Sequence, residues 1–339
     1  MQHNPQKRVA ASSRMSLVSI AQPISDDLRA FRRFFRAELR SDNVLLDTAL
    51  RYILRRKGKQ IRPILVLLSA SAAGSVSERS YVGATLVELL HTATLVHDDV
   101  VDEASERRGL PSLNSIWNNK LAVLVGDYLL AHGLRISNAH GEFRFLDITS
   151  QAVQRMSKGE LLQTRKTRKL DIDEAEYYRI ISDKTASLIS ACCEIGAVSA
   201  SDSREVQRGL REYGEELGLA FQIRDDLFDY TGAGNATGKP IGNDLQEKKL
   251  TLPLIHALKG SSRSEARRIL KLVRRGGASE PATFEEILDF VKANGGVEYS
   301  VSAARNHRDR ARAALQALPE SPARSSLASL ADFVVDRAM

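Results

Sequence analysis

The sequence predicts an all-α protein of 339 residues. Glycine and proline, which interrupt helices, number only 21 and 9, whereas alanine, leucine and arginine are plentiful. Aromatic residues make up only 6% of the chain. With 43% hydrophobic residues the chain can bury a substantial core, either as one large helical domain or as two smaller ones.

Composition also excludes several classes of protein. The formal net charge of +7 would suit an anionic partner, but no motif of basic and aromatic residues indicates nucleic-acid binding. Cys192 and Cys193 are the only cysteines, and neighbours in sequence are poorly placed for an ordinary disulfide. No apolar run reaches the roughly 18 residues of a membrane span. We therefore expect a soluble, cytoplasmic protein with no transmembrane segment.

The N-terminal region lacks acidic residues until a first helix begins. We interpret residues 1–20 as a flexible leader, although a transit peptide or a start at Met15 would also fit. Residues 23–27 then predict a helix start, with Ser25 as the candidate cap and two aspartates in the first turn. The aromatic residues that follow at helical spacing, up to Phe35, fit a core-facing stripe better than a membrane-surface helix.

A basic segment precedes the next helix. Residues 57–63 place three basic side chains around Gly58, just before an apolar helix expected from Ile64 to Ala73, with Pro63 in its first turn. A helix start with positive charge is a natural anion site. Basic loops are also common on solvated surfaces, so this segment alone is a weak signal.

The most informative stretch is residues 89–102, in a helix expected from about Ser80. Helical geometry puts Asp98 and Asp102 on one face and turns Asp99 by about 100° from Asp98. Three carboxylates so close repel one another unless they are protonated, fully hydrated or bound to a hard divalent cation. The apolar neighbours argue against full hydration.

A second aspartate triplet, Asp225, Asp226 and Asp229, repeats this spacing within residues 221–229. One triplet alone could be a solvated helix face. Two matched triplets favour helices that face each other across a cavity, where six carboxylates could hold several Mg²⁺ ions together with substrate phosphates.

Further candidate groups follow each triplet. Arg107 and Arg108 come directly after the first, in a loop expected from Glu103 to Ser112, and would grip a diphosphate beside the metal ligands. After helices expected at 113–136 and 146–167, an apolar stretch begins with Lys184 and a hydroxyl at the cavity edge.

Residues 231–244 form a long glycine-rich loop after the second triplet. Loops of that length are often lids or ligand clamps. This one is not a P-loop, because the GxxxxGK[ST] pattern and a preceding strand are both missing.

These motifs, in this order, resemble the all-trans polyprenyl diphosphate synthases, which extend an allylic diphosphate with isopentenyl diphosphate. The resemblance runs over about residues 28–253 and is strongest in the aspartate triplets and in residues 58–63, 107–109 and 239–253. It implies the isoprenoid synthase fold, a single-domain all-α bundle of roughly a dozen helices around a central cavity. The synthase domain would span residues 21–339, and the protein would form a homodimer.

The resemblance also implies roles for individual residues. Mg²⁺ bridging the allylic diphosphate would be held by Asp98, Asp99, Asp102, Asp225, Asp226 and Asp229. The same diphosphate would be bound directly by Arg107, Lys184, Lys239 and Lys249. Isopentenyl diphosphate would be bound by Lys59, Arg62, His91 and Arg108. Thr185 and Gln222 would lie near the developing cation.

The implied mechanism begins with cleavage of the allylic C–O bond, which yields a carbocation and diphosphate. The isopentenyl double bond then attacks, and proton loss restores an alkene. No covalent nucleophile is needed, and no Ser, Cys and His constellation is recognisable. The released diphosphate is expected to take the proton, so we nominate no side-chain base.

Product length should depend on the tunnel below the allylic site. Ala93 and Thr94 lie about one turn deeper than Asp98, and the small Ala93 predicts an open tunnel. We therefore expect the long-chain type, with products of about 30 to 50 carbons such as a quinone side-chain precursor. Bulky residues around 124–130 would be able to close the tunnel further down.

Two lysines depart from the usual pattern of the family. Lys57 and Lys248 stand where relatives often have small residues, which leaves open whether Lys248 or Lys249 reaches phosphate.

Three rival interpretations of the function are open. A short-chain synthase would share every catalytic residue. A non-catalytic subunit of a heteromeric synthase is disfavoured by the intact triplets, and a terpene cyclase by the second basic site. Product release would bring at most a peripheral contact with a membrane.

Overall fold

The computed structural model describes residues 16–55, 60–107, 109–231, 242–275 and 280–336. Some of the predicted features lie outside these ranges. They are most of the leader, most of the glycine-rich loop, and the side chains of Lys59, Arg108 and Lys239.

Helices dominate the N-terminal part. They are α1 (Leu17–Ile20), η1 (Gln22–Ile24), α2 (Ser25–Glu38), α3 (Val44–Arg55), α4 (Ile61–Ala73) and α5 (Glu78–Val101). The prediction that Ser25 caps a helix is wrong: Ser25 is already helical, and the preceding Ile24 makes no side-chain cap. The reason is that η1 leads directly into α2, so no extended cap residue separates them.

The predicted aspartate helix is α5, and its start has a clear local cause. The side chains of Ser77 and Ser80 satisfy each other's backbone N–H groups in a capping box. Gly74 ends α4 just before this turn. Much of α4 and α5 is buried, which explains why α4 shows no polar face.

The middle of the chain differs in detail from the prediction. It contains β1 (Glu106–Arg107), β2 (Leu110–Pro111), α6 (Leu113–Ile116), α7 (Asn119–Ala139), α8 (Phe143–Lys169), α9 (Glu174–Ile181), the π-helical turn η2 (Ser182–Ala186) and α10 (Ser187–Ala200). The expected loop after Asp102 includes a small antiparallel hairpin, in whose turn Gly109 has a φ of 73°. The helix expected at 113–136 is split, because Asn118 caps a new helix.

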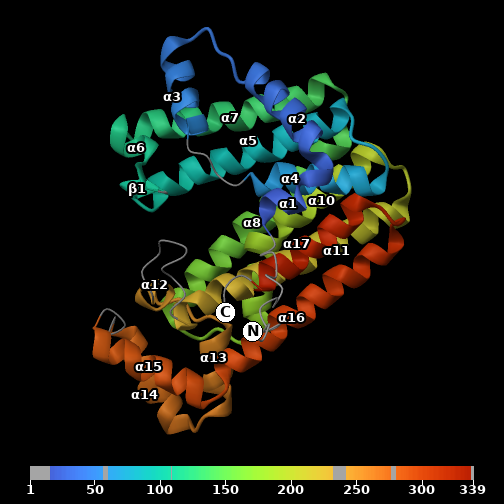
Figure 1. Ribbon diagram of the computed structural model, residues 1–339. Helices are drawn as coiled ribbons and strands as arrows, with labels where there is room; N and C mark the ends of the chain where they lie inside the picture. Colours follow the sequence, from blue (N-terminus) through green and yellow to red (C-terminus); the bar gives the residue numbers. More distant parts are fainter. Residues whose placement is uncertain (1–15, 56–59, 108, 232–241, 276–279, 337–339) are drawn as a thin grey trace, which may run out of the picture.

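The C-terminal part is again helical. It consists of α11 (Arg204–Thr231), α12 (Asn243–Gln246), α13 (Leu252–Gly260), α14 (Arg263–Arg274), α15 (Pro281–Ala293), α16 (Gly296–Ala314), η5 (Leu315–Ala317) and α17 (Pro322–Asp336). Figure 1 shows α5 and α7 side by side at the top, α11 beside α16 and α17, and α13 to α15 together at the bottom.

Two apolar cores meet along α11. Its first half places Leu210, Tyr213 and Leu217 in the core shared with α4, α5 and α10. Its second half places Ile223 and Leu227 in a second core formed with α13 to α16. The second aspartate triplet lies in this second half, between the buried residues Ile223, Leu227 and Tyr230 of the second core. The prediction of an all-α bundle is confirmed. None of the described helices combines the length and apolar character needed to cross a membrane.

Candidate functional site

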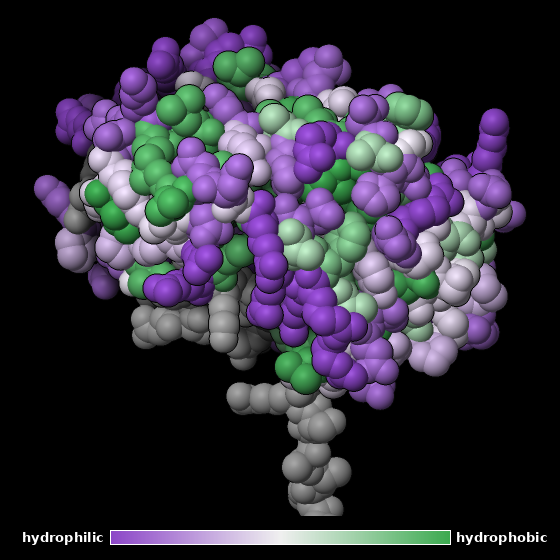
Figure 2. Space-filling model, turned by 90° about the horizontal axis from the view of Figure 1, so that it is seen from above, coloured by the Kyte–Doolittle hydropathy of each residue, from purple (hydrophilic) through white to green (hydrophobic). Residues whose placement is uncertain are grey.

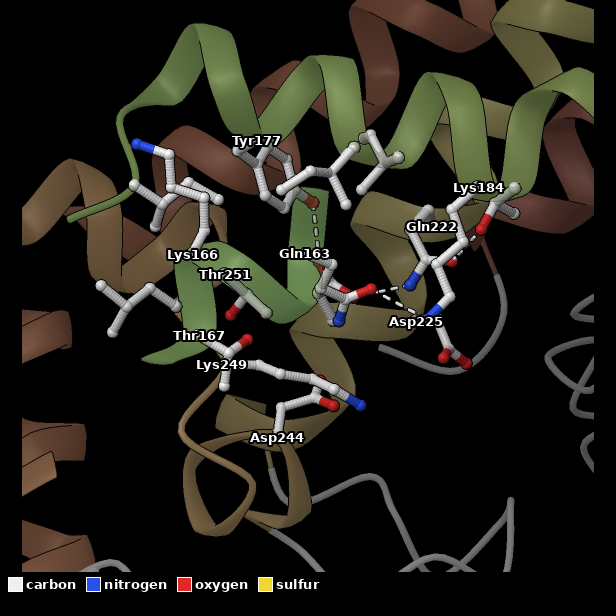
Figure 3. Close-up of a pocket in the computed structure, with 16 residues that line it drawn as sticks. Gln163, Lys166, Thr167, Tyr177, Lys184, Gln222, Asp225, Asp244, Lys249 and Thr251 are labelled. Atoms are coloured by element: carbon white, nitrogen blue, oxygen red, sulfur yellow. Dashed lines mark hydrogen bonds between the residues drawn. The ribbon is translucent and has the colours of Figure 1, made fainter. Parts of the chain in front are cut away.

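A cavity of about 240 Å³ lies between α8, α9, η2, α11 and the segment after α12 (Figure 3). Residues predicted from the sequence that line it are Lys184, Thr185, Gln222, Asp225, Asp226 and Lys249. Residues that the prediction missed include Gln163, Lys166, Tyr177, Asp244 and Thr251. Acidic and basic side chains from four separate segments therefore converge on one space.

Hydrogen bonds connect the predicted residues of the cavity to one another. The Thr185 hydroxyl donates a 2.9 Å hydrogen bond to Oε1 of Gln222. The amide of Gln222 donates in turn to Oδ1 of Asp226 at 2.8 Å, as the dashed lines in Figure 3 show. The turn η2 and helix α11 are thereby joined at the cavity edge, and Gln222 is held in one orientation.

The second aspartate triplet occupies three different environments. Asp225 is half-buried and lines the cavity. Asp226 is buried, and burial followed by the charge of Asp244 raises its pKa to about 8. Asp229 is also buried and accepts a 2.7 Å hydrogen bond from the backbone N–H of Asp244. Asp229 thus anchors the start of α12, while Asp225 faces the open space.

The first triplet divides in a similar way at the C-terminal end of α5. Asp98 and Asp102 are exposed, whereas Asp99 is only 1% exposed and forms an ion pair with Nε of Arg107. Loss of hydration followed by the charges of Asp102 and Glu160 raises the pKa of Asp98. Negative charge is therefore in excess at this end of α5.

The donor set fits a hard divalent cation. Asp98, Asp102 and Asp225 offer carboxylate oxygens, the ligands that Mg²⁺ prefers. Across the described ranges, no group of three or more His, Cys, Asp or Glu side chains is placed to hold a metal by itself. Mg²⁺ held by these carboxylates would also accept water and substrate phosphate oxygens as ligands.

The two cavity lysines that were predicted from the sequence, Lys184 and Lys249, have acidic partners. Nζ of Lys184 lies 2.6 Å from Oε2 of Glu160 and donates a 2.8 Å hydrogen bond to Gln163. Lys249 pairs with Glu247, which raises the pKa of Lys249 although burial opposes that shift. Lys248 is exposed in a left-handed conformation with φ 59°. Of the two neighbouring lysines, Lys249 is the one that lines the cavity.

The remaining predicted residues lie on α4 and α5. Arg62 is in the first turn of α4 and the half-buried His91 is in the middle of α5, and the two helices pack together. Ala93 is 2% exposed, and the Thr94 hydroxyl donates to the carbonyl of His91 at 2.8 Å.

Only some of the bulky residues in the segment 124–130 face the interior, where they would be able to close a tunnel. Leu124 and Leu130 are exposed on the outer face of α7, so they cannot do so. The large side chains of this segment that are buried are Val125 and Leu129.

Some of the cavity residues that the prediction missed could have been found from the local sequence, and others could not. Gln163 follows Glu160 by three residues on one helix, so the two face the same way. Tyr177 binds Asp226 across 49 positions, and no local pattern predicts such a contact.

The cavity therefore defines a class of protein, a helical bundle that gathers carboxylates and lysines around one internal space. Residues 43–291, well over half of the chain, match the polyprenyl synthetase family. The chain belongs to this family and is a prenyltransferase. Its resemblance to the long-chain, all-trans type is confirmed by the relatives described next.

Three relatives illustrate the similarity. The octaprenyl diphosphate synthase of Escherichia coli is 36% identical over 323 residues, 95% of this chain and 99% of that protein. Component 2 of the Bacillus subtilis heptaprenyl diphosphate synthase is 34% identical over 315 residues, 93% of this chain and 89% of that protein. The crystal structure of a Caulobacter crescentus polyprenyl synthase complexed with calcium and isoprenyl diphosphate has a TM-score of 0.86 and 34% identity, with 96% of this chain and 99% of that one covered.

Proposed function

We propose that the protein is a Mg²⁺-dependent all-trans polyprenyl diphosphate synthase. It condenses an allylic diphosphate with successive isopentenyl diphosphates to a product of about 30 to 50 carbons. The observation that carries this proposal is the cavity wall in which Asp225 lies beside Lys184 and Lys249. The calcium and isoprenyl diphosphate bound to the Caulobacter crescentus relative support it.

The first chemical step is cleavage of the allylic C–O bond, whose electron pair leaves with the diphosphate. Lys184, Lys249 and Arg107 neutralise the charge that accumulates on this leaving group. Mg²⁺ held by Asp98, Asp102 and Asp225 would supply Lewis-acid stabilisation of the same anion. The oxygens of Thr185 and Gln222, 2.9 Å apart, provide partial negative charge at the edge where the allylic cation develops.

The second substrate would be held by Arg62 and His91, together with Lys59 and Arg108. Its double bond attacks the allylic carbon to form the new C–C bond, and loss of a proton to the released diphosphate restores an alkene. Closure of the site keeps water from trapping the cation. No side chain is required as nucleophile or as base.

Chain length would be controlled on α5. Ala93 is buried one turn before Asp98, and its methyl group leaves more space than an aromatic side chain would. The growing chain can therefore extend past this turn. A product of this length is suited to be a quinone side-chain precursor, released by a cytoplasmic enzyme through peripheral contact with a membrane.

A homodimer would use the outer face of α7. Val123, Leu130 and Leu134 are exposed on one stripe of this helix, at intervals of seven and four residues, with Leu124 beside them. Figure 2 shows apolar (green) side chains among polar ones on the left, over the end of the molecule that carries α3, α6 and α7. Such a stripe is suited to a second copy related by a twofold axis.

A second candidate function is a subunit of a heteromeric synthase, favoured by the similarity to component 2 of the Bacillus subtilis enzyme. The two interpretations differ in whether this chain acts alone. The test incubates the purified chain with Mg²⁺, farnesyl diphosphate and labelled isopentenyl diphosphate, with and without a chelator.

Each outcome of this test selects one interpretation. Incorporation that the chelator abolishes supports the proposed synthase. If a folded chain neither incorporates isopentenyl diphosphate nor releases diphosphate, the result would contradict the synthase in favour of the subunit. Release of diphosphate without uptake of isopentenyl diphosphate would indicate a terpene cyclase.

A further inference from the structure

The π-helical turn η2 separates α9 from α10 and carries two residues of the cavity wall, Lys184 and Thr185. A π turn inserts one residue beyond the α-helical repeat and is less stable than the α-helix, so it persists only where its surroundings favour it. Here the extra residue changes the direction in which the following side chains point. The contacts that stabilise η2 therefore affect where Lys184 and Thr185 lie.

Arg155 of α8 contacts η2 at two side chains. Its Nε donates a 2.9 Å hydrogen bond to Oδ1 of Asp183, and its Nη2 donates a 2.7 Å hydrogen bond to Oγ of Ser182. Arg155 is not among the residues that line the cavity. It binds the two residues that immediately precede Lys184.

The same guanidinium is paired with Glu215 of α11. Nη1 and Nη2 of Arg155 lie 3.1 and 2.8 Å from the two oxygens of Glu215, and Ser182 donates a 2.5 Å hydrogen bond to that carboxylate. Above all, the hydrogen bonds to Glu215 raise the pKa of Arg155. Such two-point pairs restrict orientation as well as distance, so one arginine links α8, η2 and α11.

Glycines let the two flanking helices approach the turn closely. A Cβ atom at Gly159 of α8 would lie 2.7 Å from the backbone nitrogen of Lys184. A Cβ atom at Gly218 of α11 would lie 2.5 Å from Cα of Ala186. The backbone of η2 is therefore packed between α8 and α11, and a small rotation of Arg155 or Glu215 would be transmitted to it.

We propose that Arg155 and Glu215 are positioning residues, which together form a clamp that keeps η2 π-helical and so sets the places of Lys184 and Thr185. Neither residue touches substrate in this account. The inference rests on the proposed function, in which Lys184 binds the allylic diphosphate. Loss of the clamp would leave Asp183 and Glu215 half-buried without their shared cation, which favours a rearranged turn.

Conservative variants test the clamp. Arg155→Lys keeps the charge but loses the two-point geometry, and Glu215→Gln keeps the shape but loses the charge. For each folded variant we expect kcat/KM for the allylic diphosphate to fall by about 10- to 100-fold, because small misplacements of a positioning group cost about that much. The KM for isopentenyl diphosphate should stay within about twofold of the wild-type value, because Arg62 and His91 belong to other helices.

A second readout does not depend on activity. In both variants the backbone amides of residues 182–187 should exchange with deuterium at least several-fold faster than in the wild type. The matched control is Arg79→Lys, which weakens a two-point pair with Glu142 at the start of α5, about 30 Å along the helix from Asp98. It should change neither the activity nor the exchange at η2.

A double variant shows whether the clamp acts through Lys184. If it does, Arg155→Lys combined with Lys184→Ala should be no worse than Lys184→Ala alone, to within about twofold. Additive losses, or variants with wild-type kinetics and wild-type exchange, would overturn the proposal. If Lys184→Ala kept full activity, the role proposed for Lys184 would fail, and faster exchange at η2 would still show that the clamp holds the turn.

Discussion

The Tyr177 hydroxyl donates a 2.6 Å hydrogen bond to Oδ2 of Asp226. Both residues are almost fully buried, at 3% and 4% exposure, and the other carboxylate oxygen accepts from Gln222. Protein donors thus bind both oxygens of Asp226, while its neighbour Asp225 lines the cavity. One helical turn supplies an oriented internal carboxylate and a second one that faces the substrate space.

Replacing Tyr177 should therefore weaken the fold around the second triplet. Tyr177→Phe removes a donor from a buried carboxylate, which costs about 1 to 3 kcal/mol of unfolding free energy. Urea unfolding of the metal-free protein measures this loss. Tyr178→Phe, at the neighbouring half-buried tyrosine, is the matched control and should cost less. Equal stability of Tyr177→Phe and wild type would show that the hydrogen bond does not stabilise the protein.

The carboxylates that face solvent or the cavity should matter for activity more than for stability. Asp98→Asn and Asp225→Asn each remove a charge from the expected metal site, and we predict activity losses of at least about 100-fold with melting temperatures near that of the wild type. Steady-state kinetics over a range of Mg²⁺ concentrations checks this. Asp202→Asn, in the turn before α11, serves as the control. Full activity in the presence of a chelator would refute the metal requirement.

The two cysteines should be inert in the folded protein. Both are completely buried, and burial raises the pKa of Cys193 to about 12. Iodoacetamide at pH 8 should therefore label neither thiol until the chain is unfolded by guanidinium, as mass spectrometry would show. Rapid labelling of the native protein would contradict the burial.

The same burial predicts how stability changes in alkaline solution. The folded-state pKa of Cys193 lies above the value of 9.0 for a free thiol, so only the unfolded chain loses this proton between about pH 9 and pH 12. The contribution of the thiol to the free energy of unfolding is present below pH 9 and declines as the pH rises through that window. Cys193→Ala should show a shallower decline in urea unfolding series.

A larger residue at position 93 should shorten the product. Ala93→Phe would place a ring beside the expected path of the chain, and we predict products of about 15 to 20 carbons with a stability cost of about 1 to 3 kcal/mol. Chromatography of the dephosphorylated products measures their length. Ala93→Ser, which stays small, should leave the length unchanged. Long products from Ala93→Phe would show that the growing polyprenyl chain does not pass beside residue 93.

A charge on the outer face of α7 should separate the proposed dimer. Leu130→Glu and Leu134→Glu each place a carboxylate in the exposed apolar stripe, so the molar mass measured by light scattering should fall from that of two chains to that of one. Val18→Glu introduces the same charge at a residue that is 83% exposed on α1 and should have no effect. A wild-type protein that is already monomeric would contradict the dimer.

The sequence predicts best those features that repeat over short distances. The start of the aspartate helix α5 was placed within two residues, because Ser77 and Ser80 form a local cap. The convergence of Lys184, Gln222 and Asp225 followed from motif order and from the family resemblance. Local patterns also misled: Ser25 is not a cap because η1 runs into α2, and Leu124 points outward.

Contacts between residues far apart in the chain had no such signal. Arg155 meets Glu215 across 60 positions, and an isolated arginine on α8 is typical of a solvated surface. The π-helical form of η2 was also unexpected, since residues 182–186 have an ordinary helical composition. Both features depend on how α8 and α11 pack, which the local sequence does not determine.

We propose that this chain makes long all-trans polyprenyl diphosphates without a partner of another kind. The most direct measurement incubates the purified protein with Mg²⁺, farnesyl diphosphate and labelled isopentenyl diphosphate, and separates the dephosphorylated products by length. We expect a ladder of products that ends at about 30 carbons or more. Products that stop at about 20 carbons, one isopentenyl unit beyond the primer, or no incorporation at all, would contradict it.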